Sequence, residues 1–267
     1  MNNALIIGQY VPGESLVHRL DPRTKITIIF FFVFIVFFAN SAWSYGFITA
    51  FALASMFTTR IPIRYIIKGL TPVWFLIIFT FILHLFVTRE GTVVFDYWIF
   101  EFYSGGIVQG FAISMRFFLL ILVTSLLTLT TTPIEITDAI EDMLHPLKKV
   151  KFPVHELALM MSISLRFIPT LMQETEKISR AQASRGVDFK TGPIKERVKA
   201  VVPLLVPLFV SAFKRAEELA MAMEARGYQG GEGRTKLREL KIERRDIFIY
   251  LIFACIIAGL FWTRSYS

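Results

Sequence analysis

Five apolar segments constrain the fold of this chain more than any other feature of its sequence. A helix of about 20 apolar residues crosses the hydrocarbon core of a bilayer, and somewhat shorter helices suffice where the bilayer thins. Because lipid offers no hydrogen-bond partners, a spanning backbone must be helical or form a closed barrel. Of the 267 residues, 54% are hydrophobic, and the mean hydropathy is +0.56. We therefore predict an all-α integral membrane protein with about five transmembrane helices, near residues 26–39, 45–58, 71–87, 107–129 and 247–262.

The first two segments are short for full spans, and only residues 40–44 separate them. We expect them to form a tight helical hairpin, with the first helix extended back toward Leu20; one re-entrant pair is the alternative. The outer loop from Thr88 to Gly106 alternates acidic residues with apolar and aromatic ones. That pattern favours a small hairpin or an interfacial segment.

The 29 Lys and Arg residues are distributed unevenly among the segments between these spans. Twenty lie between Pro133 and Asp246 and six flank the first two spans, whereas only Arg89 and Arg264 lie on the opposite side. Cytoplasmic loops of membrane proteins carry an excess of basic residues. The N-terminus and the long basic segment are therefore predicted to be cytoplasmic and the C-terminus external, in a bacterial plasma membrane. The same rule accounts for the net charge of +8 without a nucleic-acid partner.

This pattern divides the chain into three parts. Residues 1–131 form an N-terminal transmembrane region with about four spans. Residues 132–246 form a cytoplasmic domain of long crossing amphipathic helices, and residues 247–267 form the last span with a short external tail. The cytoplasmic part opens with Thr132 and Pro133, which are typical of a helix start, and Pro146 limits this first short helix.

Two longer cytoplasmic helices share one plan, with an apolar first half and a polar second half. One is expected from about Val154 to Arg185, and the other from near Pro193 to Arg226, bent by Pro203 and Pro207. With an offset of 41 residues the two helices align best at their ends.

Both long helices end in the same short pattern. The first tip comprises Ala183, Ser184, Arg185 and Gly186, and the second comprises Ala225, Arg226 and Gly227. A glycine directly after a helix adopts the left-handed conformation that closes it, and an arginine before it interacts favourably with the negative end of the helix dipole. One such pattern is an ordinary helix end. Two of them on helices of similar design indicate matched contacts, in which each arginine can form a bidentate pair with a partner carboxylate.

Arg116 lies about ten residues into the fourth predicted span. A charge at that depth is either a functional group or a packing residue bonded to hydroxyls or carbonyls of neighbouring helices. No acidic residue lies in any predicted span to pair with it, which favours packing. His84 in the third span is likewise interpreted as a packing residue, because the other histidines are not at ligand spacing.

The sequence lacks the motifs of nucleotide-binding and hydrolytic sites. It contains no Gly-x-x-x-x-Gly-Lys-Ser/Thr loop, no Gly-x-Ser-x-Gly and no His-Glu-x-x-His. We expect no catalytic residue, no metal site and no cofactor in this chain. If the protein takes part in active transport, another subunit must supply the energy.

A family resemblance rests on two N-terminal strings and the paired tips. The strings are Gly8-Gln9-Tyr10-Val11-Pro12-Gly13 and His18-Arg19-Leu20-Asp21-Pro22-Arg23-Thr24-Lys25. In this order, over nearly the whole chain, they resemble the transmembrane T component of energy-coupling factor vitamin transporters. The CbiQ-like relatives of this family include the corresponding subunit of cobalt and nickel transporters.

The resemblance implies a non-catalytic subunit that couples ATP hydrolysis to transport. Two ABC-type ATPase subunits would bind ATP and Mg, and each tip would dock into one of them through residues 183–186 and 225–227. The usual family tip is Ala-Arg-Gly, so Ser184 replaces an alanine. The apolar faces of the long helices would hold a separate substrate-binding membrane subunit, the S component, within the lipid bilayer.

Two alternatives differ from this expectation. The chain could instead serve a cobalt or nickel importer of the same type. It could also be a self-contained membrane carrier or enzyme with an intramembrane site around Arg116 and His84, which the lack of acidic residues in the spans disfavours.

Overall fold

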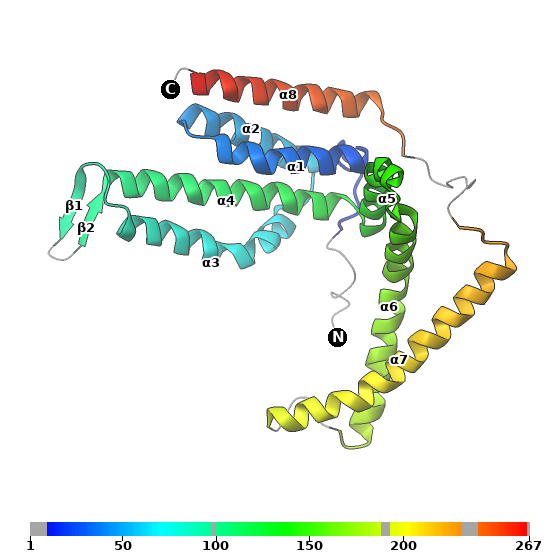
Figure 1. The fold of residues 1–267 in the computed structure, drawn as a ribbon. Coiled ribbons are helices and arrows are strands. Elements are labelled where there is room, and N and C mark those ends of the chain that lie inside the picture. Colours follow the sequence, from blue (N-terminus) through cyan, green and yellow to red (C-terminus); the bar gives the residue numbers. More distant parts are fainter. Residues whose placement is uncertain (1–9, 98–99, 188–192, 231–239, 266–267) are drawn as a thin grey trace. The chain divides into compact units, whose positions relative to one another are not determined.

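The computed structural model describes residues 10–97, 100–187, 193–230 and 240–265 (Figure 1). The described residues fall into two compact units. The first unit contains residues 10–139 and 240–265, and the second contains residues 140–187 and 193–230. Each unit is described separately.

The first unit is a bundle of long helices. Its helices are α1 (Pro22–Phe38), α2 (Ala42–Thr59), α3 (Ile63–Val87), α4 (Ser104–Thr130) and α8 (Arg244–Ser265). Each coincides with one of the predicted apolar segments and extends beyond it at one end or both, and α1 begins close to Leu20 as expected. The α4 helix packs against α1, α2 and α3, and α8 packs against α1 and α2. Buried apolar side chains from α1, α2, α4 and α8, such as Phe32, Ile48, Leu122 and Phe253, form the core. The all-α class is thus confirmed.

Small residues allow α3 and α4 to pack closely. Gly106, Gly110 and Ser114 recur every fourth residue along α4 and form one face of this helix. A Cβ at Gly110 would lie 3.3 Å from atoms of Phe81 and His84 on α3. Ser114 donates its hydroxyl to the carbonyl of Ile77 at 3.3 Å. A ridge of small residues of this kind is typical of helices that associate in a membrane.

Length and composition alone single out fewer spans than the five expected. In the described residues, α4, the segment Arg244–Thr263 of α8 and helix α6 (Val154–Ser184) qualify. The α3 helix joins them only if its two halves, bent by 59° between Thr71 and Val73, count as one span. The α1 helix does not qualify because it has only 17 residues. The α2 helix does not qualify because its serines and threonines lower its mean hydropathy. The α6 helix was expected in the cytoplasm, and it qualifies because its first half is apolar on nearly every side.

A short hairpin precedes α4. Strands β1 (Val93–Tyr97) and β2 (Phe100–Tyr103) pair antiparallel. The prediction of a small hairpin in the loop between the third and fourth spans is confirmed.

The second N-terminal string forms a polar cluster in the first unit. Lys25 donates from Nζ to the carbonyls of His18 and Thr130, at 3.3 and 3.1 Å, and to the hydroxyl of Thr131 at 3.1 Å. The buried carboxylate of Asp246 accepts the backbone N–H of Asp21 at 2.9 Å. These bonds join the first turns of α1 and α8 to the end of α4.

Helix α5 (Pro133–Leu144) begins with the predicted cap. Thr132 accepts the N–H of Glu135 on its hydroxyl at 3.3 Å, and the Glu135 carboxylate accepts the N–H of Thr132 at 3.1 Å. This reciprocal pair is a capping box. The α5 helix crosses from the first unit into the second, and the two units meet in sequence after residue 139.

Two long helices dominate the second unit. After a 3₁₀ segment (His145–Val150), α6 runs from Val154 to Ser184 and α7 from Ile194 to Ala225. Both bounds agree with the prediction to within a residue, and Pro169, Pro203 and Pro207 lie inside the helices. The two helices cross, as Figure 1 shows, and Glu174 pairs with Arg215 where they contact each other.

Candidate coupling site

The first tip closes helix α6 with a Schellman motif. Gly186 has a φ of +87° and donates its N–H to the carbonyl of Ala183 at 3.0 Å. Val187 donates to the carbonyl of Gln182 at 3.1 Å. Together these two bonds satisfy carbonyls that the helix end would otherwise leave free. The predicted left-handed glycine is confirmed.

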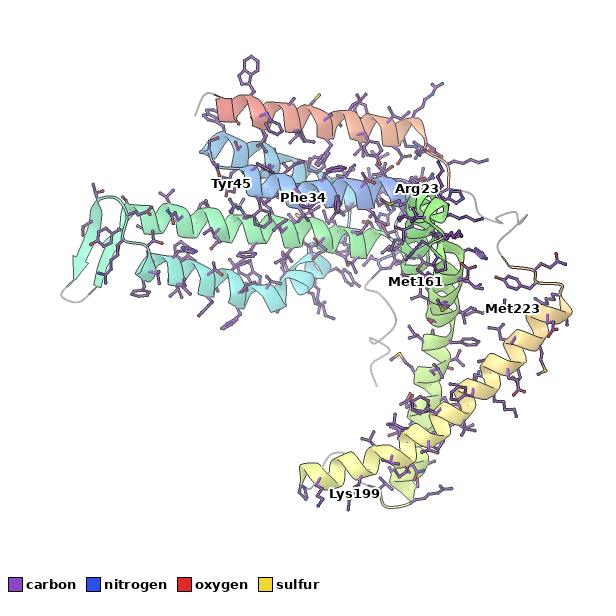
Figure 2. All side chains as sticks on the ribbon, viewed as in Figure 1. Arg23, Phe34, Tyr45, Met161, Lys199 and Met223 are labelled. Atoms are coloured by element: carbon purple, nitrogen blue, oxygen red, sulfur yellow. The ribbon has the colours of Figure 1, made fainter. Side chains whose placement is uncertain are left out.

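The second tip closes α7 with the same pattern of bonds. Gly227 has a φ of +72° and donates to the carbonyl of Glu224 at 2.9 Å. Tyr228 donates to the carbonyl of Met223 at 3.0 Å. Met223 is labelled in Figure 2, close to this end of α7. The two tips therefore share one backbone geometry as well as one sequence pattern.

Both tip arginines are exposed, as are the small residues beside them. At Arg185 and Arg226 the backbone φ angles are −88° and −90°, so the backbone has the same conformation at both arginines. The hydroxyl of Ser184 donates to the carbonyl of Arg180 at 3.1 Å and is directed back onto its own helix. The Ser184 hydroxyl is therefore already bonded within its own helix.

The structure does not bring the two tips together. They end separate helices that diverge from their crossing (Figure 1). Two arginines at separate positions suit contacts with two separate partner surfaces.

A groove of about 840 Å³ lies beside the second tip, between α6 and α7. Leu159 and Phe167 of α6 contribute apolar walls, and Arg226 and Tyr228 contribute from the tip. Arg166, Arg215 and Glu218 also line it. The groove is therefore lined by apolar side chains and by charges of both signs.

Tyr228 also makes a side-chain contact that the sequence does not reveal. Its hydroxyl lies 3.3 Å from Nε2 of His155, on the first turn of α6. The other ring nitrogen of His155, Nδ1, lies 3.3 Å from the carboxylate of Glu141 on α5. The sequence signal for this contact is weak, because 73 residues separate Tyr228 from His155.

Arg116 lies in the first unit and bonds to the turn between α1 and α2. It donates from Nη2 to the carbonyl of Ala39 at 3.3 Å and to the hydroxyl of Tyr45 at 3.1 Å (Figure 2 labels Tyr45). Its guanidinium carbon lies 5.2 Å from the centre of the Phe37 ring. These are the contacts of a packing residue, a carbonyl and a hydroxyl of neighbouring helices.

His84 makes a separate, local contact. Its Nδ1 lies 3.3 Å from the hydroxyl of Thr88, one turn further along the chain. Within the described ranges, no hydrogen bond or ion pair joins His84 to Arg116. Over these same residues, no group of three or more His, Cys, Asp or Glu side chains is placed to hold a metal ion.

Comparison with known proteins identifies the family of this chain. A family model described as "Cobalt transport protein" (CbiQ) matches residues 13–237. The energy-coupling factor transporter transmembrane protein EcfT of Bacillus subtilis (strain 168) is 61% identical over 265 residues, 99% of this chain and 100% of that protein.

Two further relatives carry the same name. EcfT of Exiguobacterium sibiricum is 54% identical over 94% of this chain and 96% of that protein. EcfT of Listeria innocua is 51% identical over 99% of this chain and 100% of that protein. With this level of identity over nearly the full length, the chain belongs to the CbiQ family and, within it, to the transmembrane EcfT components of energy-coupling factor transporters.

Proposed function

We propose that this chain transmits the ATP-driven motion of two ATPase subunits to a separate substrate-binding membrane subunit, and so drives the uptake of a vitamin. As an EcfT component it is a membrane subunit of a transporter with several subunits. We further propose that it contacts two ATPases through its tips and an S component through α7, and that the substrate is a vitamin.

The paired tips are the observation that carries the proposal. Two exposed arginines, Arg185 and Arg226, stand on identical helix endings, which suits docking into two related partners. A guanidinium at such an end can bind a carboxylate through two parallel hydrogen bonds. The sequence has no P-loop, so ATP and Mg would be bound by the partner ATPases.

An apolar face on α7 supports contact with a membrane subunit. Its large side chains are exposed over nearly three turns, at Val202, Leu205, Val206, Phe209, Val210 and Phe213. An unpartnered apolar face of this size is typical of an interaction surface. We assign it to the substrate-binding S component.

The basic residues support the proposed orientation. Both tips lie in the segment with most of the chain's Lys and Arg, which we place in the cytoplasm together with the N-terminus. The C-terminus would then face the outside of a bacterial plasma membrane.

Charge reversal at the tips tests this proposal. We expect the double variant Arg185→Glu and Arg226→Glu to insert in the membrane but to lose co-purification with the ATPases and uptake of a panel of radiolabelled vitamins. The matched control is Arg180→Glu, on the same helix as the first tip but one turn before it, which should retain both. Normal uptake in the double variant would contradict the tip mechanism.

Cobalt or nickel transport is the second candidate. The description of the matching family model, "Cobalt transport protein", favours it. Uptake of radioactive cobalt and nickel by cells that express the transporter distinguishes the two candidates, since we expect vitamin uptake without metal uptake.

A further inference from the structure

The two tips differ in the residue that follows the glycine. At the first tip this residue is Val187, whose side chain has no hydrogen-bonding group. At the second tip it is Tyr228, a half-buried residue whose hydroxyl lies 3.3 Å from Nε2 of His155. The backbone N–H of Tyr228 closes the Schellman motif, so one residue belongs both to the tip and to this side-chain contact.

His155 connects Tyr228 to helix α5. A carboxylate can only accept, so Nδ1–H of His155 donates to Glu141, at 3.3 Å. In the neutral ring Nε2 is then the acceptor, and the Tyr228 hydroxyl donates to it. The side chains of His155 and Glu141 are only 26% and 20% exposed, so water has limited access to these bonds.

The consequence is a direct connection from Arg226 to α5. Tyr228 is two residues after Arg226, and Glu141 lies on α5, which two residues separate from the end of α4. The first tip has no equivalent connection to α5 through Val187, whose side chain cannot form a hydrogen bond. Its side-chain bond to another helix is to α7, where Gln182 Nε2 donates to the carbonyl of Pro203 at 3.4 Å.

We propose that Tyr228 and His155 are positioning residues that couple the second tip to α5, so that displacement of Arg226 is transmitted to α5 through the chain Tyr228–His155–Glu141. This inference rests on the proposed function, because it assumes that an ATPase displaces Arg226. It assigns unequal roles to the two tips: the first acts along α6 and through its contact with α7, and the second acts on α5 as well.

Hydrogen–deuterium exchange of α5 tests the coupling in the complete transporter. The complex, purified with its ATPases, is compared with and without ATP and Mg²⁺, and exchange is followed in peptides that cover residues 133–144. We expect a nucleotide-dependent change in wild type. Tyr228→Phe, which removes only the hydroxyl, should lose this change while the ATPases still co-purify.

Two substitutions of His155 separate its two bonds. In His155→Gln the terminal amide occupies the place of Nε2 and can still bond to Tyr228, whereas in His155→Asn it occupies the place of Nδ1 and reaches only toward Glu141. Since each variant keeps only one of the two bonds that the chain Tyr228–His155–Glu141 requires, both Gln and Asn should lose the change in α5. Val187→Ala, the matched control at the first tip, should leave it unchanged.

The outcomes distinguish this inference from the function it rests on. If the double variant Arg185→Glu and Arg226→Glu retains the ATPases, the proposed function fails. If the double variant releases them but Tyr228→Phe retains the wild-type change in α5, only the coupling through Tyr228 fails. Loss of the ATPases in Tyr228→Phe would also overturn the inference, because Tyr228 would then act in docking.

Discussion

Glu174 of α6 and Arg215 of α7 form an ion pair, with 2.7 Å between Oε2 and Nη2, at equivalent positions of the two helices. The residues are 41 apart, which is the offset that aligns the two tips. Each therefore precedes its tip arginine by the same length of helix, eleven residues or roughly 16 Å. The ion pair helps to fix the crossing, together with the bond from Gln182 Nε2 to the carbonyl of Pro203 at 3.4 Å.

The first prediction concerns this ion pair. Glu174→Lys places two positive charges at the crossing, and we expect the distance between the tips to become more variable. Double electron–electron resonance between nitroxides on Ala183→Cys and Ala225→Cys, in a Cys255→Ser background, measures that distance. The distribution should broaden in Glu174→Lys and narrow again when Arg215→Glu is added.

Glu176→Lys is the control for this measurement. It makes the same charge change on α6, but Glu176 pairs with Arg180 of its own helix. The distribution should keep its wild-type width in this variant. An unchanged width in Glu174→Lys would show that the ion pair does not fix the crossing.

A second prediction concerns Gly227, whose φ of +72° is unfavourable for residues with a Cβ. A Cβ there would meet no atom within 4 Å, so substitution changes the backbone energy without a clash. Gly227→Ala should cost about 1 kcal/mol and weaken ATPase association about fivefold, measured by titration of the purified ATPases.

Asparagine, which tolerates the left-handed region, should weaken the association less than alanine at this position. Gly46→Ala in α2, also without an atom within 4 Å of the added Cβ, should leave the association unchanged. Equal affinities for Gly227→Ala and wild type would mean that the tip docks in another backbone conformation.

The third prediction addresses Arg116. Arg116→Ala removes the bonds to Ala39 and Tyr45, and we expect a loss of about 1–3 kcal/mol in stability, seen as a lower unfolding temperature in detergent. Tyr45→Phe removes one of these bonds and should cost less. Uptake should fall only as far as the amount of folded protein falls, and a folded, assembled but inactive variant would identify Arg116 as a functional residue.

The fourth prediction is a pH dependence at Asp21. Burial raises the pKa of this carboxyl, but hydrogen bonds from the side chain and backbone of Arg23, with the charges of Arg23 and Lys25, outweigh burial and hold the pKa below its ordinary value of 3.8. The ionised form is therefore favoured in the folded state, and its contribution is lost as pH falls through the lowered pKa.

Asp21→Asn should accordingly lower the unfolding temperature at pH 7, by an amount that shrinks as the pH falls below about 3.8. Glu14→Gln is the control, because Glu14 pairs with Arg19 at the exposed surface. A gap between wild type and Asp21→Asn that stays constant over this range would contradict the assignment.

Local signals explain why the helix ends could be predicted from the sequence. The Gly186 and Gly227 endings and the Thr132 cap are each closed by bonds within six residues, and the residue types that form them are recognisable. The ends of α6 and α7 therefore agree with their predictions.

Distant contacts explain what the sequence could not predict. Asp21 and Asp246 are 225 residues apart, and Tyr228 and His155 are 73 apart, so each contact depends on how whole helices pack. For Arg116 the sequence predicts the kind of partner, a carbonyl or hydroxyl of a neighbouring helix, but not which residues provide it. Spans are difficult to predict for a different reason. The first half of α6 is as apolar as a membrane span, whereas its second half is polar.

The prolines of the two long helices all lie on one side of the Glu174–Arg215 pair. Pro169 precedes Glu174, and Pro203 and Pro207 precede Arg215, whereas no proline lies between the pair and either tip. A proline removes a hydrogen bond and lets a helix bend. The helical segment between the ion pair and each arginine is therefore stiff, and bending is concentrated in the segments that precede the pair. Because Gln182, near the first arginine, is bonded to the carbonyl of Pro203, a bend of α7 at its prolines acts directly on the end of α6.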